Sequence, residues 1–176
     1  MKKEINQKLF EIYISKQEIA SKIAHLGNRI SEDFEGKELI IVGVLNGAFV
    51  FLADLCRHIT VPTQLSFLRI SSYQGLQSSE SIEKKMELNE DLSGKHVLIV
   101  EDIVDTGISM NFLLNQINSH APSSISVATL LFKPEAFQFN YPLNYVGFEI
   151  PNKFVVGYGL DYDGLGRNLP DIYQLV

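Results

Sequence analysis

Short runs of consecutive apolar residues alternate along the chain with segments in which apolar residues recur every three or four positions. The apolar runs predict buried strands, at residues 38–45, 64–71, 97–101, 124–132, 145–150 and 154–158. The other segments predict helices, at residues 15–34, 48–59 and 109–120. Because strands and helices alternate, we expect an α/β fold with a central, mainly parallel sheet flanked by helices.

The first predicted helix carries two signals of its own. Its apolar residues gather on one face: Ile19, Ile23, Leu26 and Ile30. Ser15 and Glu18 have the spacing of a capping box, in which each side chain bonds the backbone of the other residue. We therefore expect this helix to begin at Ser15.

Length and composition fit one domain spanning residues 1–176, with 45% apolar and 20% charged residues. The net charge of −6 gives no electrostatic footprint for binding nucleic acid or an anionic membrane. The longest apolar stretch, residues 39–53, is shorter than the roughly 20 residues of a membrane helix. The N-terminus is a poor signal peptide, and Cys56 is the only cysteine, so we expect a cytoplasmic protein.

One segment departs from the alternating pattern. Residues 72–95 are polar and charged, with glycine at positions 75 and 94. A polar loop of this length in a compact domain is either a functional lid or a disordered segment, and the sequence favours neither.

The stretch "HVLIVEDIVDTGIS", residues 96–109, combines a buried strand with a chemical motif. Glu101 and Asp102 follow the apolar run at the carboxyl edge of the predicted sheet, where open α/β folds bind ligands. Carboxylates there can accept hydrogen bonds from sugar hydroxyls and can bind a hard cation such as Mg²⁺. The turn from Asp105 to Ser109 opens a helix, whose free amide groups can hold a phosphate.

The same stretch allows two other interpretations. An acidic surface turn after a core strand would need no ligand. A signalling receiver domain shares the "VLIVED" start and the lysine-proline pair Lys133-Pro134. In a receiver, however, these features lie near opposite ends of the domain, whereas Asp102 and Lys133 are separated here by one helix and one strand.

Residues 101–109 resemble the phosphoribosyl-pyrophosphate signature at every position. The resemblance extends over most of the chain and narrows to the hypoxanthine-guanine phosphoribosyltransferases, which are type I phosphoribosyltransferases. Four further stretches resemble motifs of that family: the pyrophosphate loop and its helix (44–57), the Ser-Tyr of the lid (71–73), the base-reading lysine segment (132–135) and the C-terminal purine pocket (151–162 and 166–170).

The resemblance implies a role for each matching residue. The ribose and the 5′-phosphate would contact Glu101, Asp102, Asp105, Thr106, Gly107, Ile108 and Ser109. The purine would contact Lys133, Phe154, Val155 and Asp161. Pyrophosphate would contact Leu45, Asn46, Gly47 and Arg167. Asp105 would act as the catalytic group, Ser72 and Tyr73 would belong to the lid, and Mg²⁺ would be held by Glu101, Asp102 and Asp161.

Two residues depart from the family's pattern. Asn46 stands where the family usually has lysine or arginine, so the loop lacks that positive charge. In the family the peptide bond before this position can be cis, and the sequence does not indicate which isomer is present here. Ile108 stands where some relatives have lysine, so the phosphate would rely on backbone amides and hydroxyl groups.

The resemblance implies an enzyme of purine salvage. It would transfer the phosphoribosyl group of 5-phosphoribosyl 1-pyrophosphate to hypoxanthine or guanine, with a hood formed by the N- and C-terminal parts over the central sheet. The family also suggests a homodimer or homotetramer. The alternative is a catalytically idle relative that senses a nucleotide or binds RNA. The presence of Asp105, Lys133 and Arg167 together favours the enzyme.

Overall fold

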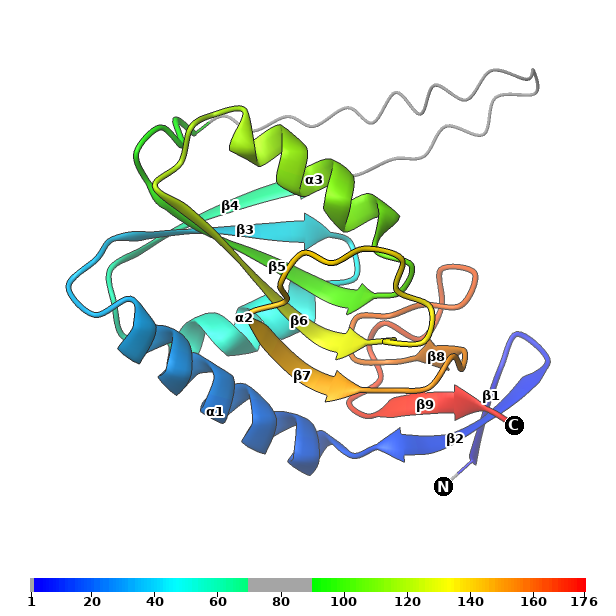
Figure 1. Cartoon of the computed structure of the whole chain (residues 1–176). Helices are drawn as coiled ribbons and strands as arrows, with labels where there is room; N and C mark the ends of the chain where they lie inside the picture. Colours follow the sequence, from blue (N-terminus) through cyan, green and yellow to red (C-terminus); the bar gives the residue numbers. More distant parts are fainter. Residues whose placement is uncertain (1, 70–89) are drawn as a thin grey trace, which may run out of the picture.

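The computed structural model describes residues 2–69 and 90–176 (Figure 1). The predicted lid residues Ser72 and Tyr73 lie outside the described residues, as does most of the segment 72–95. The elements in chain order are β1 (Lys2–Ile5), β2 (Lys8–Ile14), α1 (Lys16–Asp33), β3 (Leu39–Leu45), α2 (Phe49–Leu55), η1 (Cys56–His58), β4 (Thr63–Arg69), β5 (His96–Val104), α3 (Ile108–Asn118), β6 (Ser124–Phe132), β7 (Tyr145–Glu149), β8 (Val155–Val156) and β9 (Ile172–Leu175).

Within the described residues, five parallel strands form the central sheet in the order β4-β3-β5-β6-β7. This arrangement confirms the predicted α/β fold. The chain moves from β3 to β4 in one direction and then returns to place β5 on the other side of β3. Such a reversal opens a crevice beyond the carboxyl ends of the strands. The loops after β3 and β5 are therefore the expected location of a ligand site.

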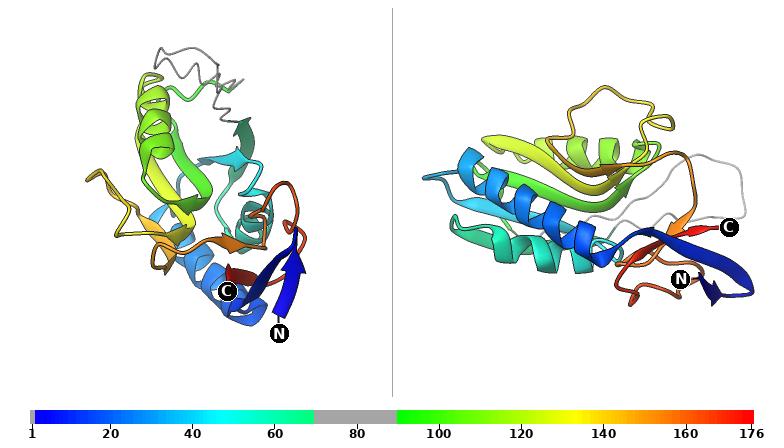
Figure 2. Two further views of the ribbon diagram at one scale, coloured as in Figure 1. Left: turned by 90° about the vertical axis from the view of Figure 1, so that its right-hand side faces the viewer. Right: turned by 90° about the horizontal axis from the view of Figure 1, so that it is seen from below.

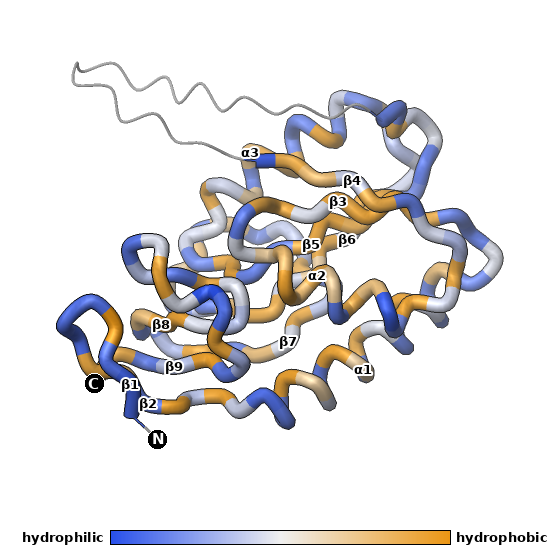
Figure 3. Tube along the Cα trace, turned by 180° about the vertical axis from the view of Figure 1, so that it is seen from behind, coloured by the Kyte–Doolittle hydropathy of each residue, from blue (hydrophilic) through white to orange (hydrophobic). Residues whose placement is uncertain are grey.

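Helices cover both faces of this sheet, as Figures 1 and 2 show. Alternate residues of β3 face opposite layers, since Ile41 packs in the core under α1 and α2, whereas Ile40 and Val42 pack under α3. The central strands are accordingly hydrophobic along most of their length, while polar residues gather in the outer loops (Figure 3). No helix in the described part of the chain is long and apolar enough to cross a membrane.

The helix predicted at 15–34 is confirmed. Ser15 is the N-cap of α1, and both bonds of the capping box to Glu18 are present. The predicted apolar face is buried: Ile19, Ile23, Leu26 and Ile30. Gly27 lies on the same face, where an added Cβ would fall 2.3 Å from the Cβ of His58. The helix can therefore pack closely against the end of the α2–η1 segment.

A second sheet forms the hood that the resemblance implied. Within the described residues its strands run in the order β1-β2-β9-β8, with antiparallel pairing throughout. A small core holds it together: Ile5, Phe10, Val156 and Tyr173. Figure 1 shows the hood beyond the carboxyl ends of β5, β6 and β7, with both termini in it.

The structure corrects two strand predictions. The strand at 154–158 shrinks to Val155–Val156 and belongs to the hood, because the chain turns at Gly157 and Tyr158, which both have positive φ angles. The strand at 97–101 extends to Val104, because pairing with β6 continues through Ile103 and Val104. Asp102, which the predicted strand left out, therefore lies within β5 beside Glu101.

Candidate functional site

Two adjoining cavities lie at the carboxyl end of β5 and bring most of the predicted residues together. The larger, about 260 Å³, is lined by Asp102, Ile103, Asp105, Lys133, Phe154, Val155, Leu160 and Asp161. The smaller, about 120 Å³, is lined by Ile103, Val104, Asp105, Thr106, Gly107, Ser109 and Met110. Because both cavities share Asp105, the predicted purine and phosphate residues lie in one continuous site.

A charged pair crosses the larger cavity. The Nζ atom of Lys133 lies 2.9 Å from Oδ2 of Asp105, and Lys133 is only 7% exposed. Neighbouring strand ends deliver the two residues, and the backbone amide of Lys133 donates to the carbonyl oxygen of Val104. Nζ also donates to Oδ1 of Asn152 at 3.5 Å, a contact that no motif in the sequence indicated. The pair thus offers a positive donor and a negative acceptor side by side.

The acids of β5 are crowded and partly shielded from water. Burial raises the pKa of the Glu101 carboxyl well above its usual range, and the neighbouring charge of Asp102 raises it further. Burial also raises the pKa of Asp102, while hydrogen bonds and the positive charge of Arg167 act in the opposite direction. Oδ1 of Asp102 accepts a hydrogen bond from the backbone amide of Ile103 at 2.8 Å. The charged forms of two crowded, buried carboxyl groups are stabilised by a neighbouring cation or by hydroxyl groups that donate hydrogen bonds to them.

The turn predicted to bind phosphate begins α3. Gly107 is the N-cap with φ of 83°, which favours glycine, and an added Cβ would lie 2.6 Å from the ring of Phe137. The hydroxyl of Thr106 accepts from the amide of Ile108 at 3.5 Å. The hydroxyl of Tyr141 donates to the carbonyl oxygen of Gly107 at 2.8 Å. The turn is therefore fixed in shape, with the start of a helix directed at the small cavity.

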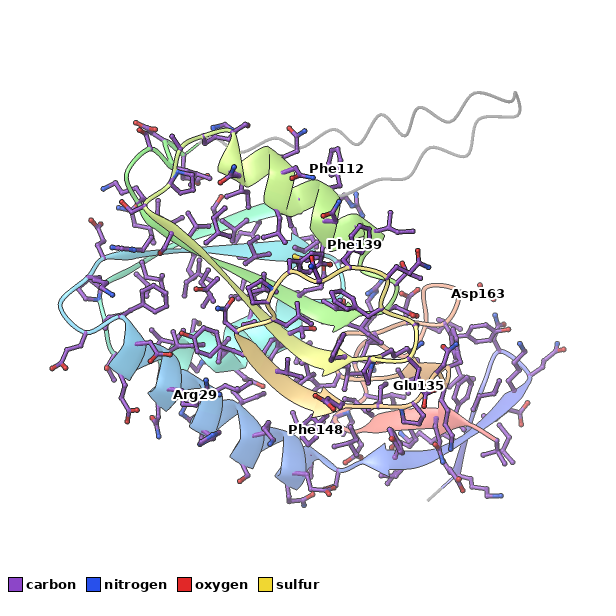
Figure 4. The ribbon with its side chains drawn as sticks, in the orientation of Figure 1. Arg29, Phe112, Glu135, Phe139, Phe148 and Asp163 are labelled. Atoms are coloured by element: carbon purple, nitrogen blue, oxygen red, sulfur yellow. The ribbon has the colours of Figure 1, made fainter. Side chains whose placement is uncertain are left out.

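The loop between β6 and β7 holds this turn from outside, and the sequence prediction missed it. Phe137 and Tyr141 meet edge to face with ring centroids 5.0 Å apart, and Phe139 packs beside both. Figure 4 labels Phe139 on this loop. The backbone amide of Gln138 donates to the carbonyl oxygen of Thr106 at 3.1 Å. The closely spaced aromatic residues at 137, 139 and 141 were the available signal.

The hood supplies the opposite wall of the larger cavity. Phe154 is 45% exposed and meets Tyr162 edge to face at 5.5 Å, whereas Val155 is buried. Asp161 forms an ion pair with Arg167, with 2.6 Å between Oδ1 and Nη2. Arg167 also donates from Nη1 to the carbonyl oxygen of Gly159 at 2.7 Å. An exposed aromatic face therefore lines a cavity that also contains the Lys133–Asp105 pair.

The loop after β3 lies directly against Asp102 in the site. The Leu45–Asn46 peptide bond is cis. A Cβ added to Gly47 would lie 1.6 Å from Oδ2 of Asp102, so this position has no room for a side chain. Gly159 approaches from the hood, where an added Cβ would lie 2.2 Å from the carbonyl oxygen of Gly47. The loop is thus held between the acids of β5 and the segment that carries Arg167.

The described residues contain no cluster of three or more histidine, cysteine, aspartate or glutamate side chains arranged to bind a metal ion. The Glu101–Asp102 pair nevertheless fits a hard divalent cation in its chemistry, since it supplies carboxylate oxygens whose mutual repulsion a cation would relieve. Asp161 is held by Arg167 and by the amide of Gly164, so its carboxylate is already partly satisfied.

Comparison with known proteins decides the family. Residues 11–163 match the family described as "phosphoribosyl transferase domain", which covers most of the chain. The chain belongs to this family. The match confirms the resemblance found in residues 101–109 and excludes the receiver interpretation.

Relatives of this phosphoribosyltransferase include two named bacterial enzymes. It is 41% identical to the hypoxanthine phosphoribosyltransferase of Salmonella typhimurium, over 94% of this chain and 95% of that protein. It is 42% identical to the hypoxanthine-guanine phosphoribosyltransferase of Mycobacterium tuberculosis, over 93% of this chain and 88% of that protein.

Solved structures agree with these relationships. A hypoxanthine-guanine phosphoribosyltransferase from Bacillus anthracis, with a HEPES molecule in its active site, matches with a TM-score of 0.84 at 37% identity, covering 94% of this chain and 96% of that chain. A ternary substrate complex of a mutant hypoxanthine phosphoribosyltransferase from Trypanosoma cruzi matches with a TM-score of 0.86 at 39% identity, covering 94% of each chain. The type I phosphoribosyltransferase fold is therefore confirmed.

Proposed function

We propose that this phosphoribosyltransferase transfers the phosphoribosyl group of 5-phosphoribosyl 1-pyrophosphate to N9 of hypoxanthine or guanine. The products are IMP or GMP and pyrophosphate. The named relatives support this activity. The single structural observation that carries the choice of base is the Lys133–Asp105 pair in the larger cavity, near the exposed ring of Phe154.

A 6-oxopurine matches this pair. Lys133 is a donor only, so it suits the oxygen on C6, whereas the 6-amino group of adenine would place two donors against each other. The carboxylate of Asp105 suits the N7 proton of the incoming base and acts as general base for its removal. Before the base arrives, each group satisfies the other at 2.9 Å, so the purine replaces one ion pair with two charge-assisted hydrogen bonds.

The purine ring would stack on Phe154, with Val155 forming the buried floor. The ribose hydroxyls would donate to Glu101 and Asp102, and the 5′-phosphate would occupy the smaller cavity at the start of α3. The hydroxyl groups of Thr106 and Ser109 and the backbone from Gly107 to Ile108 belong to that phosphate site. The order of these subsites follows the order of base, sugar and phosphate in the product.

The leaving pyrophosphate would bind at the loop of Leu45, Asn46 and Gly47, with Arg167 as a bidentate donor. Mg²⁺ is the proposed cofactor: one ion would be held by Glu101 and Asp102, and a second, through water, by Asp161. When bound, it would neutralise charge on the leaving pyrophosphate. Positive charge that develops on the sugar during transfer would lie beside the acids of β5.

Several features of this proposal are predictions from the sequence. They are a cytoplasmic location, a homodimer or homotetramer, the absence of nucleic-acid and membrane partners, and lid roles for Ser72 and Tyr73. The proposed partners are 5-phosphoribosyl 1-pyrophosphate and the two purine bases.

A panel of bases tests the function. Purified protein, 5-phosphoribosyl 1-pyrophosphate and Mg²⁺ are incubated with hypoxanthine, guanine, xanthine, adenine or uracil, and nucleotides are separated by chromatography. We expect IMP and GMP, with little or no AMP or UMP. Formation of no nucleotide by folded protein would reject the enzyme and favour the nucleotide-sensing or RNA-binding regulator.

A further inference from the structure

Arg69 is the last residue of β4 and lies beside the pyrophosphate loop. Parallel pairing places it opposite Leu45, the last residue of β3. Its Nη2 atom donates to Oδ1 of Asn46 at 3.3 Å. The guanidinium group is therefore next to the loop, although no sequence motif included this residue.

The positive charges around the site differ in what they already bind. Lys133 is paired with Asp105, and Arg167 is paired with Asp161. For Arg69, no carboxylate among residues 2–69 and 90–176 lies within ion-pair distance. Its partner is the neutral amide of Asn46, and the residue is exposed. Arg69 thus carries a positive charge that its described neighbours do not neutralise.

The two arginines lie on different flanks of the same loop. Arg167 is tied to Gly159, which approaches the carbonyl oxygen of Gly47 from the hood. Arg69 reaches Asn46 from the edge strand of the central sheet. An anion with two linked phosphoryl groups can bridge such flanks, because each guanidinium presents a planar fork that matches phosphate oxygens.

We propose that Arg69 is a pyrophosphate-binding residue that supplies, from β4, the positive charge absent at Asn46. The inference rests on the proposed function and assigns its leaving-group subsite. On binding, the guanidinium exchanges a hydrogen bond to a neutral amide for charge-assisted bonds to phosphoryl oxygens, which are the stronger kind. Asn46 holds the arginine near the loop until the anion arrives.

Direct binding of inorganic pyrophosphate tests this role without relying on turnover. Calorimetric titration with pyrophosphate and Mg²⁺ is compared between the unmodified protein and Arg69→Gln. We expect the Kd to rise about tenfold, the lower end of the effect of losing a hydrogen bond to a charged group. The Kd of IMP should stay within about twofold, since the phosphate site at α3 does not include Arg69.

Two further variants identify the cause. Asn46→Lys combined with Arg69→Gln returns a positive charge to the loop and should restore most of the pyrophosphate affinity. If Arg69 served only to hold Asn46 in place, this double variant would stay weak. Arg29→Gln is the matched control, because Arg29 is exposed on α1, stacks on Tyr145, and lies toward the end of α1 far from the hood (Figure 4).

The outcomes separate this inference from the proposed function. An unchanged pyrophosphate Kd in Arg69→Gln, with IMP still formed by the unmodified protein, overturns the role of Arg69 and leaves the enzyme intact. A raised Kd that the double variant fails to restore also overturns it. If the unmodified protein forms no nucleotide, yet Arg69→Gln binds pyrophosphate more weakly than the unmodified protein does, the proposed function is rejected and the proposed anion site is retained.

Discussion

Replacement of Lys133 tests how the base is selected. The side chain is 9% exposed and its Nζ atom lies 2.9 Å from Asp105, so it cannot turn to solvent without leaving the cavity. A hydrogen bond to a charged group is worth roughly 1.5–3 kcal/mol, which corresponds to about 10- to 150-fold in kcat/KM. We expect Lys133→Gln to lower kcat/KM for hypoxanthine by a factor in this range.

The ion pair adds a second effect that the assay must separate. Loss of Lys133 leaves Asp105 without its positive neighbour, so any substitution at 133 also removes the ion-pair partner of the proposed general base. Glutamine carries both a donor and an acceptor, and its carbonyl oxygen can receive the 6-amino group of adenine. Methionine has a similar length but offers no such acceptor, so Lys133→Met shares the change at Asp105 without the gain for adenine.

The measurement is kcat/KM for hypoxanthine and for adenine in the unmodified protein, Lys133→Gln and Lys133→Met. We expect the hypoxanthine-to-adenine ratio to fall in Lys133→Gln by more than in Lys133→Met. A ratio that is the same in all three proteins would refute the assignment, because selection would then come from groups other than this side chain.

Three further substitutions test the rest of the site. Asp105→Asn keeps the shape of the side chain but removes the proposed general base, so kcat should fall by about 10²–10⁴-fold with little change in the KM of the ribosyl donor. An unchanged kcat would remove Asp105 from catalysis. Gly47→Ala would bring a Cβ to 1.6 Å from Oδ2 of Asp102. We therefore expect overpacking to destabilise the protein by about 1–3 kcal/mol and to raise the KM of the ribosyl donor. An unaltered melting temperature and KM would show that the loop can move to accommodate the side chain. Tyr141→Phe should cost about 1 kcal/mol of stability at neutral pH by removing the bond to Gly107. Burial raises the pKa of Tyr141 from 10.0 to about 12, so the stability that its neutral hydroxyl contributes is present in full below pH 10.0 and is lost as the pH rises toward 12. Denaturant titrations should therefore show a smaller loss of stability at alkaline pH in the variant than in the unmodified protein. An equal loss in both proteins would contradict this.

The centre of the sheet was predictable because its inner strands, β3, β5 and β6, are buried along most of their length. Continuous apolar runs such as residues 38–45 and 124–132 leave little choice of structure, and β6 matches its prediction at both ends. Of the hood strands only β8 was predicted, as part of a longer strand at 154–158, whereas β1, β2 and β9 were not. β2 has mixed exposure along its length, and its partner β9 is far away in sequence, with Phe10 opposite Leu175. Pairing of that kind depends on the tertiary fold rather than on local pattern.

The candidate site also has one part that the sequence indicates and another part that only the structure reveals. Residues 101–109 could be proposed as a ligand site from the sequence, because their motif lies in one contiguous stretch. Arg69 could not, since its place beside Asn46 follows from the parallel register of β3 and β4. Tyr141 was missed for a related reason, because it reaches Gly107 across a loop that has no regular pattern. Contacts between motifs required the structure.

The division between two sheets has a consequence for specificity. The proposed ribose-binding and phosphate-binding residues lie on β5 and on the turn before α3, at the carboxyl edge of the central sheet. Phe154, Val155 and Asp161 belong to the hood and the segment between β8 and β9. Lys133 stands where the two meet, at the end of β6 and against Asp105. Under the proposed function, changes in the hood would therefore alter the choice of base while the donor site keeps its geometry. A change at Lys133 would affect both recognition of the base and proton transfer, since the two proposed roles share one ion pair.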